Sequence, residues 1–146
     1  MTTIQQVLDK KGREILSVRP DNSVFDAIKK MTEHNVGALL ATQGADISGI
    51  ITERDYLRRV ILQGRSSRMT EVREIMTEKV ICVGPASEVE ECMAIMTDRR
   101  IRHLPVFSEK KLIGLVSIGD LVRSQATERE FHIGYLTDYI TGKYPG

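Results

Sequence analysis

Two stretches of this sequence place a hydroxyl and, three residues later, a carboxylate directly after a short apolar run. The first pair is Thr52 with Asp55, and the second is Ser117 with Asp120. A Ser/Thr-x-x-Asp pattern is typical of a helix start, where both side chains accept hydrogen bonds from free N–H groups. The same corner lies at the positive end of the helix dipole, where phosphate groups bind. We therefore expect two helix caps that can also hold a ligand.

The charge and composition of the chain exclude several kinds of partner. It has 21 Lys+Arg and 20 Asp+Glu, a net charge of +1, so we expect neither nucleic acid nor a membrane as a partner. Cys82 and Cys92 have no CxxC spacing and suit reduced thiols. No apolar run reaches the about 18 residues of a membrane span, and the N-terminus does not resemble a signal peptide. These features favour a cytoplasmic protein.

The two corners belong to an internal repeat with a constant offset of 65 residues, as between Asp55 and Asp120. Anchor residues of several types recur at this offset without a gap. They are Pro20/Pro85, Val24/Val89, Met31/Met96, Leu39/Leu104, Gly49/Gly114 and Arg58/Arg123. An ungapped match of this length indicates a tandem duplication.

Each copy has the hydrophobic pattern of a strand, a helix, two strands and a second helix. In the first copy the strands are predicted at 15–18, 36–41 and 47–52, with helices from Val24 and from Tyr56. In the second copy the strands are predicted at 80–83, 103–107 and 112–117, with helices from Val89 and from Leu121. The fold class that follows is α+β, with tandem β-α-β-β-α units.

A single β-α-β-β-α unit of about 48 residues is too small to bury its own hydrophobic core well. We therefore expect the two copies to pack about a pseudo-two-fold axis, with their corners side by side in two related clefts. An extra N-terminal helix and a C-terminal helical tail complete the prediction. The predicted parts are 1–12 (helix), 13–63 (repeat 1), 64–78 (linker), 79–127 (repeat 2) and 128–146 (tail).

Patterns for catalysis and metal binding are missing from the sequence. It contains no GxxxxGK[ST], HExxH or GxGxxG motif, and its three histidines have no metal-ligand spacing. We therefore expect no enzyme, no catalytic cofactor and no metal site. The densest basic run, from Arg99 to His103, suits either a phosphate-binding cluster or a solvated helix end.

The repeat, with Ile101-Arg102-His103-Leu104-Pro105-Val106 and the two Gly-h-h-Ser/Thr-x-x-Asp corners (h, hydrophobic), resembles a CBS-domain pair, or Bateman module, over about residues 12–127. The whole chain is similar to the small stand-alone proteins of this kind in bacteria. The resemblance implies an adenosyl ligand such as AMP, ATP or NAD(H) in the clefts between the repeats. It also implies a disc-shaped homodimer that senses ligands and does not catalyse.

The resemblance also assigns residues to each cleft. One cleft would take Ser117, Asp120, Leu115, His103, Leu16, Val36 and Gly37. The mirrored cleft would take Thr52, Asp55, Ile50, Ala38, Ile81, Ile101 and Arg102. In both, the aspartate would hold the ribose, the hydroxyl would face phosphate, and the adenine would lie between aliphatic side chains.

Two hypotheses of function follow. In the first, the protein senses an adenine nucleotide and signals to a partner protein that the sequence does not identify. In the second, it is a structural oligomerisation or interaction module with no physiological ligand. At equivalent positions the first copy has Gly37-Ala38 and the second copy has Arg102-His103, so we expect the two clefts to differ as well.

Overall fold

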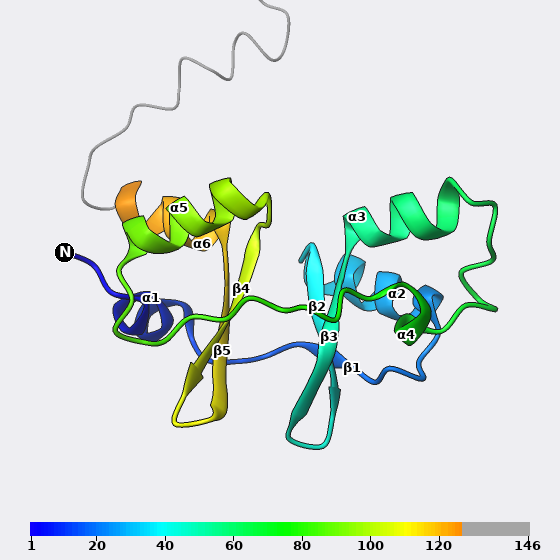
Figure 1. Ribbon diagram of the computed structural model, residues 1–146, viewed down its shortest axis with the longest axis horizontal. Coiled ribbons are helices and arrows are strands. Elements are labelled where there is room, and N and C mark those ends of the chain that lie inside the picture. The colour runs from blue at the N-terminus through cyan, green and yellow to red at the C-terminus, as the bar shows by residue number, and fades with distance from the viewer. Residues whose placement is uncertain (127–146) are drawn as a thin grey trace, which may run out of the picture.

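A computed structural model describes residues 1–126 of the chain, arranged as two small sheets with helices around them (Figure 1). In chain order the elements are α1 (Ile4–Lys11), β1 (Ser17–Val18), α2 (Val24–His34), β2 (Ala38–Gln43), β3 (Asp46–Thr52), α3 (Glu53–Tyr56), the π-helical turn η1 (Leu57–Ile61), α4 (Val72–Ile75), α5 (Val89–Arg99), β4 (His103–Ser108), β5 (Lys111–Ser117) and α6 (Ile118–Ala126). This arrangement confirms the predicted α+β class with tandem repeats.

The two sheets are built alike and place the two corners at equivalent points. In the first sheet β2 lies between β1, which is parallel to it, and β3, which is antiparallel. In the second sheet β4 and β5 are antiparallel. Ala38 pairs with Thr52 and His103 pairs with Ser117, so each hydroxyl lies beside the first residue of the preceding strand. Strand pairing therefore brings each corner next to a residue assigned to a cleft.

Each sheet is covered by a helix that lies outside the β-α-β-β-α unit of that sheet. Helix α1 precedes the first repeat, yet its residues Ile4, Val7 and Leu8 are buried in the core of the second sheet. Helix α4 follows the first repeat and buries Val72 and Ile75 in the core of the first sheet. Figure 1 shows the chain crossing between the two halves after α1 and again after α4. The second core is therefore completed across a crossing, whereas the buried residues of the first core all lie between Val18 and Met76.

Helices α1 and α4 are equivalent under the repeat, and α1 is one turn longer. The backbone bonds that attach them are matched: Ile4 N to Ser87 O (2.9 Å) and Val89 N to Thr2 O (3.0 Å), against Val72 N to Asn22 O and Val24 N to Thr70 O (both 2.8 Å). With Ile4 matched to Val72, α4 ends at Ile75, which corresponds to Val7. Helix α1 continues for four more residues, to Lys11, which is about one turn.

The strand that we predicted over residues 80–83 is wrong: the segment makes only an isolated parallel bridge at Val83. In the first repeat, Leu40 N donates to Leu16 O at 3.4 Å and helps to hold β1. The residue equivalent to Leu40 is Pro105, which has no N–H to donate. The missing donor leaves residues 80–83 with too few ladder bonds to form a strand.

Other differences from the prediction are smaller. The strand predicted at 15–18 is reduced to Ser17–Val18, and the helix expected from Tyr56 is a short α-helix followed by η1. The linker expected at 64–78 contains α4. The tail predicted at 128–146 lies outside the described residues. Among the helices of residues 1–126, none combines the length and apolar character needed to cross a bilayer.

The position of α1 can be tested with Leu8→Ala. Leu8 is fully buried, and its Cδ2 lies 2.6 Å from where a Cβ on Gly114 would be. Removing a side chain packed this closely leaves a cavity, so we expect the free energy of unfolding to fall by about 2–5 kcal/mol. Urea denaturation followed by circular dichroism measures the change. Leu62→Ala, at a site 78% exposed, is the matched control and should change stability by less than about 0.5 kcal/mol. Equal effects of the two substitutions would contradict the packing.

Candidate functional site: a cleft between the two repeats

A cavity of about 400 Å³ lies at the junction of the two repeats, where the end of β5 and the start of α6 face the loop before β2. This volume is within the range of small-molecule sites. The cavity is lined by Lys11, Gly12, Glu14, Leu16, Asn35, Val36, Gly37, Ala38, His103, Leu115, Ser117, Asp120 and Arg123. All of the residues that the family resemblance assigned to the first cleft are among them. The structure thus brings these residues together, and their binding of a ligand stays a prediction.

The Ser117 corner caps helix α6 as predicted. Asp120 N donates to Ser117 Oγ at 3.1 Å, and Ser117 N donates to Asp120 Oδ2 at 2.8 Å. These reciprocal bonds satisfy two backbone donors at the helix start and hold both side chains in fixed positions. Capping therefore orients the hydroxyl and the carboxylate at the cavity wall.

Asp120 is held as a carboxylate by two cations. Its side chain is 9% exposed, with Lys11 Nζ 2.5 Å from Oδ2 and an Arg123 guanidinium nitrogen 2.6 Å from Oδ1. Burial acts to raise the pKa of this carboxyl, but the hydrogen bonds from Lys11 and Ser117 outweigh it and lower the pKa. The site therefore presents an ionised acceptor that is already paired.

Sequence reasoning missed both cations. Arg123 follows Asp120 by three residues on one helix, a spacing at which side chains interact, so it could have been found. Lys11 is 109 residues from Asp120 in sequence and also donates to Leu115 O at 2.6 Å. Only the packing of α1 on the second sheet brings Lys11 to this cleft, and the sequence carries no local signal of that contact.

His103 is a neutral side chain in this wall. Burial lowers its pKa to about 4, the nearby cations Lys11 and Arg102 act in the same direction, and Asp120 opposes them. At pH 7 its imidazole is uncharged, so it offers one donor and one acceptor and no positive charge.

Gly37 keeps the loop before β2 close to the opposite wall. A Cβ at this position would lie 2.9 Å from Glu53 Oε1 and 3.7 Å from His103 Cε1. Any larger residue would therefore displace the Glu53 side chain or fill the cavity. The absence of a side chain leaves room in the cleft.

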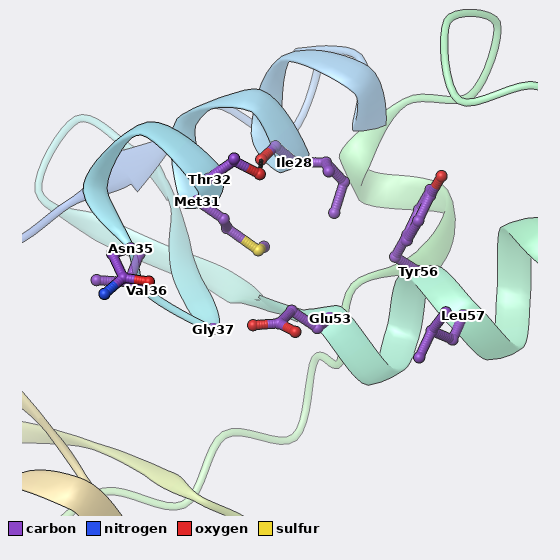
Figure 2. A pocket seen from close by; sticks show the side chains of 9 residues that line it. All are labelled: Ile28, Met31, Thr32, Asn35, Val36, Gly37, Glu53, Tyr56 and Leu57. Carbon is purple, nitrogen blue, oxygen red and sulfur yellow. Dashed lines mark hydrogen bonds between the residues drawn. The ribbon is translucent and has the colours of Figure 1, made fainter. Parts of the chain in front are cut away.

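A second cavity, of about 450 Å³, adjoins the cleft and shares Asn35, Val36 and Gly37 with it. Figure 2 shows it between α2 and the start of α3, with the Glu53 carboxylate pointing into it. The other residues that line it are Ile28, Met31, Thr32, Tyr56 and Leu57. Its walls combine apolar side chains with the polar groups of Thr32, Asn35 and Glu53, and it contains neither of the two hydroxyl–carboxylate corners.

The second corner has the same capping bonds as the first but a different neighbour. Thr52 N donates to Asp55 Oδ2 at 3.0 Å, and Asp55 N donates to Thr52 Oγ1 at 3.2 Å. The Thr77 hydroxyl lies 3.4 Å from Asp55 Oδ1. Within residues 1–126 no cation pairs with Asp55. The two carboxylates therefore differ in their electrostatic surroundings.

The remaining residues assigned to the mirrored cleft do not line one of the two cavities together. Ala38 and Ile50 belong to an apolar cluster between the sheets, and Ala38 also lines the first cavity. Ile81 and Ile101 pack against the second core, and Arg102 is exposed. Neither of the two cavities described above is lined by Thr52 or Asp55. The second site therefore stays a prediction from the repeat.

The basic run at residues 99–103 has some residues on the surface and one in the wall of the cleft. Arg99 and Arg100 are exposed at the end of α5, where Arg100 adopts a left-handed conformation (φ 55°). Of the run, only His103 lines either cavity. In the described part of the chain, no three His, Cys, Asp or Glu side chains are grouped as metal ligands.

The buried neutral His103 makes stability depend on pH. The unfolded histidine takes up a proton near pH 6.5 and the folded one only near pH 4, so stability is lost as the pH falls through this window. Between pH 7 and 4.5 we expect the wild type to lose about 2 kcal/mol more unfolding free energy than His103→Gln. Denaturant titrations at both pH values measure this. His34→Gln, at an exposed histidine, is the control and should behave as the wild type. The same acid sensitivity in all three proteins would refute the assignment.

Comparison with known proteins agrees with this architecture. The family model for the CBS domain matches residues 4–62 and 72–127, ranges that begin where α1 and α4 begin. The chain is 48% identical to the mitochondrial CBS domain-containing protein CBSX3 of Arabidopsis thaliana, over 98% of this chain and 74% of that protein. It is 53% identical to a solved protein with CBS domains from Burkholderia ambifaria, with a TM-score of 0.87 over 91% of this chain and 100% of the other. A CBS-domain containing protein from Agrobacterium tumefaciens is 37% identical, with a TM-score of 0.82 over 85% and 99%. The chain, with its two tandem repeats and shared cleft, therefore belongs to the CBS domain family.

Proposed function

We propose that this protein senses an adenine nucleotide, AMP, ATP or NAD(H), in the cleft between its repeats and passes the occupancy to a partner protein. The observation that carries the proposal is the composition of one cavity. It joins the capping pair Ser117 and Asp120 with the aliphatic side chains of Leu16, Val36 and Leu115.

Each of these groups suits one part of an adenosyl ligand. An ionised carboxylate such as Asp120 accepts hydrogen bonds from neighbouring ribose hydroxyls. Leu16 and Leu115 offer apolar surface on either side of a flat adenine ring. Ser117 and the start of the nine-residue helix α6 offer a hydroxyl and a positive dipole end to phosphate oxygens. The cavity thus has a place for base, sugar and phosphate, and the proposal includes no chemical change in the ligand.

The position of the cleft suggests how occupancy becomes a signal. Its walls come from both repeats, so a ligand that contacts both favours one relative placement of them over others. We expect a separate effector protein, or the second subunit of a homodimer, to respond to that change. A solved CBS domain pair of the same fold, 22% identical, holds 5′-methylthioadenosine and S-adenosyl-L-methionine, so these ligands enter the test as alternatives.

A second candidate function is a structural oligomerisation module without a ligand. It is favoured by three large apolar side chains that are exposed on and after η1. They are Leu57 (54% exposed), Ile61 (52%) and Leu62 (78%). Exposed apolar groups this close together are typical of protein contacts.

Thermal unfolding with added ligands separates the two candidates. A ligand at 100 times its Kd adds about 2.7 kcal/mol to stability, so the midpoint should rise by several degrees with at least one of AMP, ADP, ATP, NAD, NADH or S-adenosyl-L-methionine. Ligand recovered intact after incubation would agree with sensing, and turnover would contradict it. If no midpoint shifts at millimolar concentration, the sensor function is rejected and the oligomerisation module is retained.

The ribose assignment can be tested with Asp120→Asn. Loss of the carboxylate replaces a charged acceptor by an amide, and we expect Kd for the stabilising nucleotide to rise at least about tenfold. Isothermal titration calorimetry measures both affinity and stoichiometry. Asp55→Asn is the matched control, because it makes the same change at the other corner and should leave this cleft unaffected. Unaltered binding in Asp120→Asn would show that the ribose is held elsewhere.

A further inference from the structure

We propose that Lys11 determines the specificity of this cleft: it occupies Asp120 in competition with the ligand ribose, and so selects phosphorylated ligands over the bare nucleoside. The inference rests on the proposed function, since it concerns the same cleft. It starts from two contacts, Lys11 Nζ to Asp120 Oδ2 at 2.5 Å and Lys11 Nζ to Leu115 O at 2.6 Å.

The acceptor capacity of Asp120 is largely used before any ligand arrives. A carboxylate has about four lone-pair sites, two on each oxygen. Oδ2 accepts from Lys11 Nζ and from Ser117 N, and Oδ1 accepts from Arg123. At most one site is left for a ribose, whose two neighbouring hydroxyls need two. Because the Ser117 bond is part of the helix cap, a side-chain cation has to leave for the ribose to be held fully.

Lys11 is the cation best placed to leave. Its ammonium lies at the end of a flexible four-carbon stem, and the side chain is 34% exposed, so it can swing out while α1 stays packed. The adjacent turn of the helix is anchored by Leu8, which is fully buried. Arg123 remains on Oδ1 and keeps the carboxylate paired.

The competition is a feature of this corner and not of the repeat in general. Lys11 lies in the extra turn by which α1 exceeds α4. At the equivalent corner Asp55 meets the uncharged Thr77 hydroxyl, which can rotate away without stranding a charge. The asymmetry arises from the length of one helix.

The cost of displacement depends on what the ligand offers in return. Adenosine is uncharged, so binding it gives up a charge-assisted hydrogen bond and leaves the ammonium without an anion. AMP brings phosphate oxygens into the cavity whose wall Lys11 forms, and the released ammonium can bind them. The cleft should therefore favour AMP over adenosine by more than the phosphate contacts of Ser117 and the start of α6 alone would give.

The test compares adenosine with AMP on the wild type and on Lys11→Met by isothermal titration calorimetry. In Lys11→Met no cation has to be displaced, so we expect the affinity for adenosine to rise about tenfold, the factor for one charge-assisted hydrogen bond. The affinity for AMP should rise less than the affinity for adenosine, or fall. The preference for AMP over adenosine is therefore smaller in Lys11→Met than in the wild type. Lys10→Met removes the same charge from an exposed neighbour on α1 and should leave both affinities as in the wild type.

A second measurement needs no substitution and guards against a folding defect in the variant. Raising salt from 50 to 500 mM screens this partly buried ion pair only in part, so the wild type should bind adenosine slightly more tightly and AMP less tightly. An adenosine affinity that is unchanged or lower in Lys11→Met, or lower at high salt, would overturn the role of Lys11 while leaving the sensor function intact. If the wild type bound neither adenosine nor AMP, the role of Lys11 would be rejected, and the sensor function would be decided separately by the thermal unfolding series.

Discussion

The structure depends on one constraint: neither repeat can bury its core with its own residues alone. The chain meets this constraint with two helices outside the repeats: α1 packs on the second sheet before the chain crosses to the first, and α4 packs on the first sheet before the chain crosses back (Figure 1). Leu8 packs directly against Gly114, where any added side chain would collide with it. The two repeats are therefore locked into one unit, and the space left at their junction becomes the cleft.

The capping pairs connect local folding to the proposed chemistry. Ser117 and Asp120 satisfy the first N–H groups of α6, and the same bonds fix the rotamers of both side chains at the cavity wall. A residue that stabilises the helix start is thereby held ready for a ligand without further ordering. The proposed binding and the capping would use different lone pairs of the same carboxylate, so the two roles are compatible.

The duplication produced two corners of the same design with different electrostatics. Asp120 lies between Lys11 and Arg123, whereas Asp55 has only hydroxyl and backbone neighbours among the described residues. The difference arises because α1 is a turn longer than α4 and ends in a basic residue. A change of one helical turn at an element boundary thus gives two corners with the same capping motif different electrostatic surroundings.

The sequence by itself determined the repeat, the order of most elements and both caps, because periodicity and the 65-residue offset are properties of the chain read along its length. The residues around the first cleft came from the resemblance to a CBS-domain pair, and they do line one cavity. It misled at residues 80–83, where an apolar run predicted a strand that the missing N–H of Pro105 prevents. Only the tertiary structure decided that Lys11 would meet Asp120 across 109 residues. That contact depends on which sheet α1 covers. The second core buries Ile4, Val7 and Leu8 and so determines the position of α1, which the local sequence pattern does not indicate.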